Sequence, residues 1–534
     1  MQRRIERYHR VLAVTLPSSS RPTNPRLALI AISVVVAIMN IDITAVNVAL
    51  VSLGKDLHAR LGDLQWGLNT YMLAFAALIV TAGRLADVFG RRRCLLIGAA
   101  LFAVASLLCG NAPTLALLII GRLLQGAGGA LMLPAGMAII SIVYGADQRA
   151  VALGTIVGVA GVAQSFGPLA GGLVTSMLSW RLVFLVNLPL VALVMIVAAR
   201  SIQETNDEAA SRRIDIAGVV TLAAALTTLL IGLDATNGGD ASPAKMVGIL
   251  ALSVVLFAAF TIIERRTEAP IVDGKLLRQP VFLCSCIASG LLGFVFFLFL
   301  FISALYLQEE LGYSALTAGV ALVPFSLVIA ISGVMSGRLA RYISIATILV
   351  VSCLLLAAGL AILSFVPASD GYGGMVLPFL LIAAGAGPGF TLLNTAGLGA
   401  VPAARSGQAS GMIYMFRLGG GAVGVAAASA LHGALFHRHL VFALSRASLK
   451  LPFAEQKLLE RPGAAEHIAQ LGGSLMPGQV DQVRQAFHDS FVAAFTSTLQ
   501  LCVILPVIVA LLVLLLMRGT APLSATSNPV ADVS

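Results

Sequence analysis

Residues 83–93 have the sequence GRLADVFGRRR, and residues 337–344, 254 positions further along, have the sequence GRLARYIS. Each of the two segments directly follows a long apolar run. A second pair of similar segments, around Arg149 and around Arg405, is offset by 256 positions. Two six-span halves separated by two additional spans explain both offsets. The sequence therefore predicts an internal repeat, the feature on which the fold class depends.

Composition places the chain in a membrane. Of its 534 residues, 58% are hydrophobic and only 11% are charged, with a mean hydropathy of +0.96. A soluble chain is expected to carry about a quarter charged residues. The apolar runs are each long enough to cross about 30 Å of hydrocarbon as a helix. We predict an all-α polytopic membrane protein with fourteen spans, at 27–50, 66–83, 94–111, 114–139, 151–178, 181–199, 216–233, 246–263, 281–306, 316–336, 343–366, 375–398, 408–431 and 491–517.

The spans predict an organisation in five parts. These are a cytoplasmic N-terminal tail at 1–26, a first six-helix bundle at 27–200, two additional membrane helices with cytoplasmic flanks at 201–280, a second six-helix bundle at 281–518, and a cytoplasmic C-terminal tail at 519–534. The second bundle includes an outer loop at 433–490, which we expect to be partly helical rather than a folded domain. The N-terminal tail is not expected to be a signal peptide, because its apolar stretch VLAVTL has only six residues.

Basic residues predict the orientation, because positively charged loops stay on the cytoplasmic side. With both termini cytoplasmic, the inner segments hold 22 Lys and Arg residues, whereas the short outer segments hold four. The chain is therefore expected to be a multi-pass protein of the cytoplasmic (inner) membrane. Its net charge of +10 reflects this topology, so we expect no nucleic-acid partner.

Several functional classes lack their signature in the chain. The phosphate-binding pattern G-x-x-x-x-G-K-[ST] of ATP-driven transport does not occur. The spans contain only isolated acids and histidines, which disfavours an intramembrane enzyme or a metal site, and a channel usually shows rings of charge in a much shorter chain. Secondary transport remains, without a cofactor and driven by the proton gradient. Two repeated bundles that rock about a midplane site are typical of it.

Several motifs now point to one family. GRLADVFGRRR resembles the signature between spans 2 and 3 of the major facilitator superfamily, and LIIGRLLQGAGGA at 118–130 resembles its span-4 motif. NIDITAVNVAL at 40–50 is similar to the span-1 motif of the fourteen-span drug:proton antiporter branch (EmrB/QacA type). SWRLVFLVNLPL at 179–190 and LYLQEELGYSALTAGVALVP at 305–324 are similar to that branch as well. Two positions depart from the pattern: Val51 replaces a frequent proline, and Arg341 replaces the acid of the second-half loop.

The resemblance implies the major facilitator fold and a function. The chain is expected to export amphipathic or lipophilic organic compounds, such as drugs, antibiotics or toxic cations, in exchange for protons. Its expected partners are the lipid bilayer, the small-molecule substrate and protons, with a periplasmic adaptor protein left open. Export of one dedicated metabolite, such as a siderophore, a lipid or a self-made antibiotic, remains an alternative on the same fold. Import of small solutes and a membrane enzyme or sensor are less favoured alternatives.

Residues 158–172, GVAGVAQSFGPLAGG, resemble the antiporter motif of the superfamily's exporters. Closely spaced glycines let a neighbouring helix approach, and a proline permits a kink. We expect a bendable contact between the two halves that favours export, against the alternative of ordinary packing between small residues. The motif residues are Gly158, Gly161, Gly167, Pro168, Gly171 and Gly172.

The resemblance to the family's signature between spans 2 and 3 implies that the segment 83–93 acts as a conformational latch. A lone acid at that edge of the membrane can bind the N-terminus of a helix in the other half. We therefore expect Asp87 to hold the outward-facing state, whereas the arginines are partly explained as cytoplasmic charges. The latch residues are Gly83, Asp87, Gly90, Arg91 and Arg92.

Proton coupling is assigned to two buried charges. Asp42 is the only acid deep in a first-half span, eight residues and roughly 12 Å below the outer end at 1.5 Å per residue. Arg122 lies at the same depth in span 4. We predict that Asp42 takes up the external proton and that Arg122 tunes its release; a permanent structural ion pair is the alternative.

A cavity for amphipathic compounds needs largely apolar walls with a few polar anchors. Each candidate anchor in the spans is also a candidate for a polar bridge between helices. The expected cavity residues are Asn47, Tyr71, Gln164, Asn187, Tyr306, Asn394 and Arg417.

Overall fold

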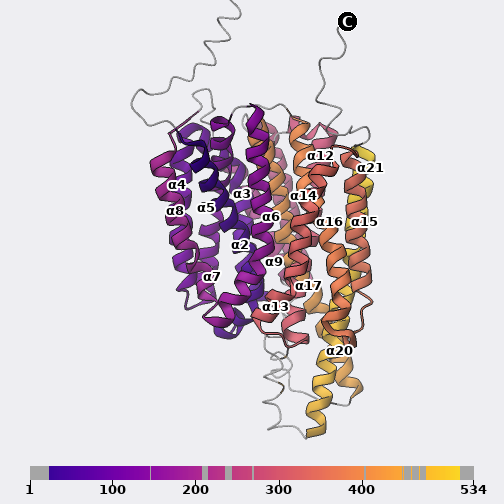
Figure 1. The fold of residues 1–534 in the computed structure, drawn as a ribbon. Helices are drawn as coiled ribbons and strands as arrows, with labels where there is room; N and C mark the ends of the chain where they lie inside the picture. The colour runs from indigo at the N-terminus through magenta and orange to yellow at the C-terminus, as the bar shows by residue number, and fades with distance from the viewer. Residues whose placement is uncertain are drawn as a thin grey trace, which may run out of the picture.

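The computed structural model consists of long helices running side by side (Figure 1). The residues that it describes contain no strand. They are 23–59, 61–144, 146–206, 215–234, 243–267, 270–272, 274–401, 405–447, 449, 459, 468 and 477–517. The predicted tails at 1–26 and 519–534 lie almost entirely outside the described residues.

The first half consists of seven helices. They are α2 (Pro25–Asp56), α3 (Leu61–Phe89), α4 (Arg91–Gly110), α5 (Leu115–Val143), α6 (Ala146–Met177), α7 (Arg181–Leu185) and α8 (Asn187–Ser201). Two more long helices and one short helix follow: α9 (Ile216–Asp234), α10 (Pro243–Arg266) and α11 (Gly274–Leu277).

The second half repeats the pattern with longer outer ends. Its elements are α12 (Pro280–Leu305), the π-helical turn η1 (Tyr306–Glu310), α13 (Ala315–Ala321), α14 (Val323–Leu339), α15 (Ile345–Leu363), the short turn η2 (Ala368–Asp370), α16 (Gly371–Gly399), α17 (Ser406–Arg446), α20 (Pro477–Cys502) and α21 (Ile504–Leu516). In Figure 1 the indigo and purple helices of the first half lie beside the orange and yellow helices of the second.

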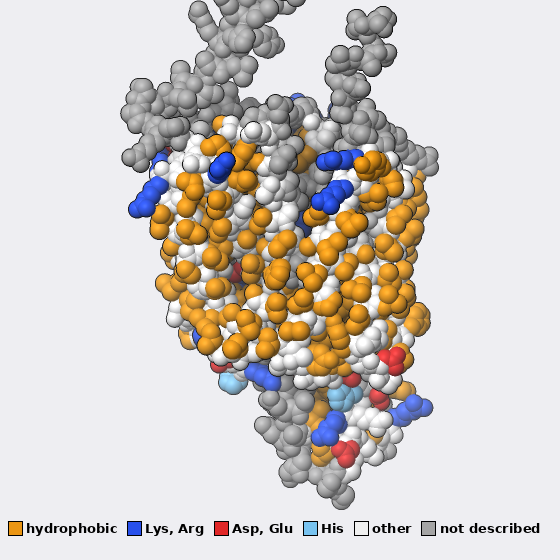
Figure 2. Space-filling view, in the orientation of Figure 1, with side chains coloured by type: hydrophobic (Ala, Val, Ile, Leu, Met, Phe, Trp, Pro, Cys, Tyr) orange, Lys and Arg blue, Asp and Glu red, His pale blue; other side chains and the backbone are white. Residues whose placement is uncertain are grey.

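The helices have the length and surface of membrane spans, which confirms the predicted class. Among the described residues, thirteen helices are long and apolar enough to cross a membrane. The predicted number of fourteen stays a prediction, since α6, over the fifth predicted span, is not among these thirteen. Hydrophobic side chains cover the middle of the outer surface, and the charged side chains lie toward its two ends (Figure 2). This is the pattern expected for a surface that faces lipid.

Three predicted spans are divided into two helical pieces. The divisions lie between α7 and α8, between α13 and α14, and between α20 and α21. In each case the second piece has a proline within its first three residues: Pro189, Pro324 and Pro506. Proline lacks the backbone N–H but fits the first turn of a helix, so it starts the new piece there.

The predicted outer loop at 433–490 is more helical than its apolar pattern indicates. α17 continues to Arg446, and α20 begins at Pro477, where it projects beyond the bundle (Figure 1). Aromatic side chains join the two extensions: the ring of His432 lies 4.7 Å from that of Phe491, and the ring of Phe436 lies 5.4 Å from that of Phe487. This packing accompanies helices that continue beyond the predicted ends of their spans.

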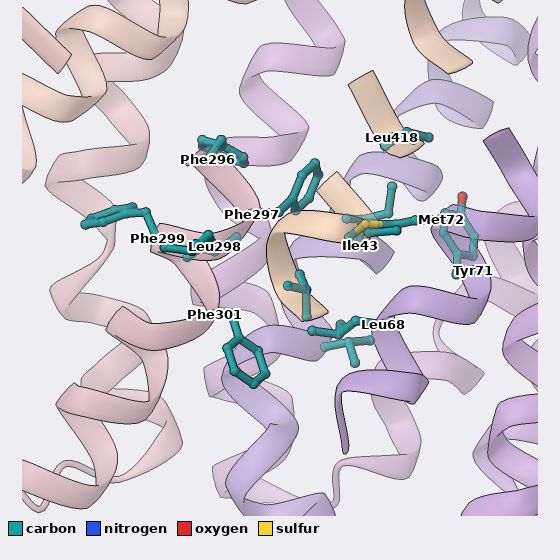
Figure 3. Close-up of a cluster of buried hydrophobic side chains, with 14 of the residues drawn as sticks. Ile43, Leu68, Tyr71, Met72, Phe296, Phe297, Leu298, Phe299, Phe301 and Leu418 are labelled. Atoms are coloured by element: carbon teal, nitrogen blue, oxygen red, sulfur yellow. The ribbon is translucent and has the colours of Figure 1, made fainter. Parts of the chain in front are cut away.

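The two halves meet through buried apolar side chains. In Figure 3, Ile43, Leu68 and Met72 from the first half face Phe297 and Leu418 from the second. All five are less than 9% exposed. Because burying such side chains keeps the halves together, any movement between them must slide or separate these residues.

Candidate functional site

The site begins with an ion pair between α2 and α5. Arg122 donates from Nη1 to Oδ2 of Asp42, and both residues are 1% exposed. The equal depth of the two residues in their spans predicts this contact. A buried ion pair is stable only when its remaining polar atoms are also bonded, because desolvation of both charges opposes it.

The guanidinium of Arg122 is held on all sides. Its Nε donates to the backbone oxygen of Gly67 at 2.8 Å, and its Nη1 donates to Oε1 of Gln125 at 2.9 Å. The guanidinium carbon lies 4.5 Å from the ring centre of Tyr71 and 5.7 Å from that of Phe184. Aromatic faces attract a desolvated cation. α3 and α7 therefore help to keep this arginine in place.

The carboxylate of Asp42 receives further hydrogen bonds from two amides. Asn187 on α8 donates to Oδ1 at 3.0 Å, and Nε2 of Gln125 donates to the same oxygen at 3.4 Å. The Gln125 amide also donates to Oγ of Ser106 on α4 at 2.8 Å. Asn187 thus contacts the charge centre, and its place in a substrate cavity stays a prediction.

Both oxygens of the Asp42 carboxylate receive hydrogen bonds. The donors lie on α5 and α8, so the position of α2 is tied to these two helices. The charge centre is closed to water in this structure, because Asp42 and Arg122 are both 1% exposed.

The glycines of 158–172 divide into two groups. A Cβ added at Gly167 would lie 1.7 Å from Oγ1 of Thr44, and one added at Gly171 would lie 2.5 Å from the backbone oxygen of Ala45, so α6 packs directly on α2. Gly158 and Gly161 have nothing within 4 Å of an added Cβ. Close helix approach is therefore seen at Gly167 and Gly171, and at Gly158 and Gly161 it stays a prediction.

The motif does join the two halves at its outer end. An added Cβ at Gly172 would lie 2.4 Å from the backbone oxygen of Ala315, and one at Gly319 would lie 2.5 Å from that of Pro168. One residue further along α13, the N–H of Leu316 donates to Oγ of Ser176 at 2.7 Å. α6 and α13 therefore touch backbone to backbone.

Other outer contacts support the same junction. Nε2 of Gln308 in η1 donates to the backbone oxygen of Val48 at 3.2 Å, which connects the second half to α2. Within the second half, Oε2 of Glu310 in η1 forms a hydrogen bond with Nδ1 of His488 in α20 at 2.9 Å. His488 precedes the predicted span 491–517, and this hydrogen bond raises the pKa of its imidazole. The outer ends of the halves are thus joined at several points.

The predicted latch is bonded within its own half. Asp87 accepts two hydrogen bonds from Arg91, at 3.0 and 2.7 Å. Gly90 has a φ of 109°, a conformation that suits glycine, and a Cβ added at Gly83 would lie 3.5 Å from Cβ of Pro134. Among the described residues, Asp87 has no hydrogen bond or ion pair to the second half.

Sequence reasoning missed the residue that fixes this loop. Glu204, just after α8, accepts hydrogen bonds from the backbone N–H groups of Arg92 and Arg93, both at 3.0 Å. These N–H groups open α4, where a carboxylate is stabilising. Nη2 of Arg92 also donates to the backbone oxygen of Ala199 at 2.5 Å. The only signal in the sequence was an acid shortly after the sixth span.

The remaining cavity candidates lie in different surroundings. Tyr71 is covered by Arg122, and Tyr306 is 5% exposed, with its ring 4.3 Å from that of Phe495. Asn47 donates to the backbone oxygen of Ile43 at 3.0 Å, although its own Oδ1 is buried without a partner. Gln164 is buried in α6.

Arg417 and Asn394 are the candidates with unmet hydrogen-bonding capacity in the second half. The guanidinium carbon of Arg417 lies 4.0 Å from the ring centre of Phe390 and 5.6 Å from that of Tyr414. Its Nε is buried without a hydrogen-bond partner, and so is Oδ1 of Asn394, one helical turn beyond Phe390. Neither residue has an ion pair among the described side chains. Both are only half-buried, so a ligand could reach them.

Two helical bundles that touch at glycines, with a buried ion pair inside the first, are typical of a secondary transporter of the alternating-access type. The chain belongs to the Major Facilitator Superfamily, whose family model matches residues 30–425. The family suggested by the sequence motifs is thereby confirmed.

Known relatives carry names of resistance and export proteins. The chain is 30% identical to the tetracenomycin C resistance and export protein of Streptomyces glaucescens, over 89% of both chains. It is 32% identical to the lincomycin resistance protein of Streptomyces lincolnensis, over 76% of this chain and 84% of that protein. It is 31% identical to the multidrug resistance protein Stp of Mycobacterium tuberculosis, over 75% of this chain and 74% of that one. These relatives are consistent with the drug:proton antiporter branch.

A solved structure shares the fold. A bacterial homologue of the human lysosomal transporter Spinster, in an inward-facing and unoccupied conformation, superposes with a TM-score of 0.64. The match covers 92% of this chain and 98% of that one at 15% sequence identity. At that identity the likeness extends to the architecture alone.

The buried pair predicts a pattern of stabilities. Arg122→Gln should lower the free energy of unfolding by about 3–5 kcal/mol, because it leaves a buried carboxylate without its cation. The double variant Asp42→Asn/Arg122→Gln should be less destabilised, since no unpaired charge remains. Thermal unfolding in detergent measures both, and Arg93→Gln, at a side chain that is 74% exposed, is the matched control. A double variant as unstable as Arg122→Gln would contradict this account.

Proposed function

We propose that this protein exports amphipathic or lipophilic organic compounds, including drugs and antibiotics, in exchange for protons. The buried Asp42–Arg122 centre is the observation that carries the proposal, because a carboxylate so far from water needs either a task or a partner. The names of the relatives supply the class of compound. Its place is the cytoplasmic membrane, with both termini on the cytoplasmic side.

The proposed coupling uses the competition for the Asp42 carboxylate. A proton that arrives from outside binds Asp42 and displaces Arg122, which weakens the tie between α2 and α5. When the carboxylate ionises toward the cytoplasm, the network of Arg122, Gln125 and Asn187 closes again. Substrate binds preferentially to this ionised state. Proton and substrate therefore cross in opposite directions.

The structure supports assignment of the conformation to an inward-facing state. Its halves are joined at their outer ends through α6 and α13, whereas Gly158 and Gly161, nearer the inner end of α6, face open space. Arg417 and Asn394, which are half-buried and have unmet hydrogen-bonding capacity, then offer a donor and an acceptor to a compound entering from the cytoplasm. The aromatic ring of Phe390 supplies an apolar wall beside them.

The export assignment has a direct test. A pump-deficient bacterial host that expresses the chain should tolerate compounds that the same host without the chain does not. It should also accumulate less of these compounds, and a protonophore should abolish this difference between the two hosts. Resistance to several unrelated lipophilic cations supports multidrug efflux, and resistance to one compound supports the dedicated exporter. Unchanged susceptibility to the whole panel, with the protein present in the membrane, would contradict export.

The contact between α6 and its neighbours predicts that the motif glycines are required for transport. Replacing both Gly167 and Pro168 with alanine should abolish efflux, because the new side chain collides with Thr44 on α2 and the kink is lost. Gly158→Ala is the matched control and should retain efflux, as nothing lies within 4 Å of its added Cβ. Efflux assays are compared at equal amounts of membrane-inserted protein. Normal efflux by the Gly167/Pro168 variant would mean that the motif serves only as ordinary packing between small residues.

Asp87 is proposed to exchange its partner during the cycle. Here it bonds Arg91, and in the outward-facing state it would bind the N-terminus of a helix in the second half. Asp87→Asn should therefore slow transport several-fold while the equilibrium binding of a transported dye stays near the wild-type value. Asp481→Asn, at an exposed acid paired with Arg484, serves as the control. A loss of affinity without a slower turnover would argue against a latch.

A further inference from the structure

Two acids outside the charge centre form a second buried group. Asp215 directly precedes α9, and Glu264 lies in the last turn of α10, so the pair belongs to the two additional helices between the halves. Asp215 is 6% exposed and Glu264 is 8% exposed. Carboxylates are almost never this buried unless something compensates their charge.

The two carboxyl groups are in contact over the start of α9. A Cβ added at Gly218 would lie 2.3 Å from Oδ2 of Asp215 and 2.8 Å from Oε1 of Glu264, so both oxygens occupy the same small space. Two ionised carboxylates have only acceptors, so neither group can hydrogen-bond the other without a proton.

The donors around the pair do not remove the need for a proton. The backbone N–H of Gly218 donates to Oδ1 of Asp215 at 2.7 Å. The N–H groups of Ile271 and Val272 donate to the two oxygens of Glu264, at 3.1 and 3.0 Å. Oδ2 of Asp215 is buried and receives no hydrogen bond from any described donor. The one oxygen without a donor is the oxygen that faces Glu264.

We propose that Asp215 and Glu264 form a second proton-binding site, in which one proton is shared between Oδ2 of Asp215 and Oε1 of Glu264. Like charges at such a distance disfavour ionisation of both groups, and one shared proton removes the repulsion. With that proton in place every oxygen of the pair has a partner.

No cation among the described residues takes the place of this proton. The hydrogen bonds that Asp215 and Glu264 accept come from backbone N–H groups, and neither carboxylate forms an ion pair with a described Lys or Arg. Arg84, on α3, donates from Nη2 to the backbone oxygen of Pro270 at 2.5 Å. The charged residues of the surrounding elements are Arg84, Arg265, Arg266, Lys275 and Arg405, of which Arg265, Arg266, Lys275 and Arg405 are exposed.

The pair also ties the additional helices to the first half. Glu264 holds the segment 270–272 by its backbone, and Arg84 of the segment 83–93 holds the same segment at Pro270. α9 packs against α3 and α17, one helix from each half. Loss of the shared proton leaves two repelling carboxylates at this junction, which loosens 270–272 and with it the hold on Arg84. The site thus gives the inner face a response to pH.

Binding of a proton by Asp215 and Glu264 can be tested without any transported compound. Infrared difference spectra of the full-length protein in lipid, recorded between acidic and alkaline pH, should contain a carbonyl stretch of a protonated carboxyl group that Glu264→Gln removes or shifts. Asp215→Asn should have the same effect, so that one variant suffices if the other fails to fold. Asp481→Asn is the control and should leave the band unchanged. A band that is identical in wild type and in both folded variants would overturn the proposal.

Transport gives a second readout, which rests on the proposed export function. Glu264→Gln mimics the protonated pair, so its efflux should no longer fall as the internal pH of loaded vesicles rises, whereas wild-type efflux should fall several-fold. A wild-type pH response that persists in Glu264→Gln would contradict the role of the pair. If no compound is exported but the infrared band is present and sensitive to the variants, the function fails and the proton site stands.

Discussion

The ion pair between Asp42 and Arg122 is the constraint on which the first half depends. Two charges with 1% exposure are tolerated only because Gln125, Asn187, a backbone oxygen of α3 and two aromatic faces complete their surroundings. These partners come from α3, α5, α7 and α8, so the pair fixes the relative positions of most helices in this half. A change in the contacts of either charge would therefore disturb most helices of this half.

Glycine contacts carry that change to the other half. α6 rests on α2 at Gly167 and Gly171, just beyond Asp42 along α2, and its next glycine touches α13 of the second half. Because backbones touch there without intervening side chains, a small shift of α2 has no flexible layer to absorb it. The contacts that run from Asp42 through α6 to α13 therefore connect the proposed proton site physically with the arrangement of the two halves.

The sequence predicted the architecture well because lipid imposes long apolar helices and the repeat survives in GRLA at 83 and 337. Equal depth also paired Asp42 with Arg122. The sequence pattern does not show which tertiary contacts a residue makes. Asn187 has the chemistry of a cavity residue but donates a hydrogen bond to Asp42, and Gly158 resembles the other motif glycines although an added Cβ there would meet nothing within 4 Å. Glu204, Asp215 and Glu264 lie at helix ends, where a charge is ordinary in any sequence, so only the structure shows their burial or their bonds.

Proton-driven transport by Asp42→Asn in vesicles is the measurement that tests the central claim most directly. Asn keeps the shape of the side chain and can still accept from Arg122, but it cannot gain or lose a proton. With a pH gradient imposed and expression matched, the variant should exchange labelled compound across the membrane but should neither accumulate it uphill nor move protons with it. Uphill transport at the wild-type level with normal proton movement would remove Asp42 from the coupling and contradict the account.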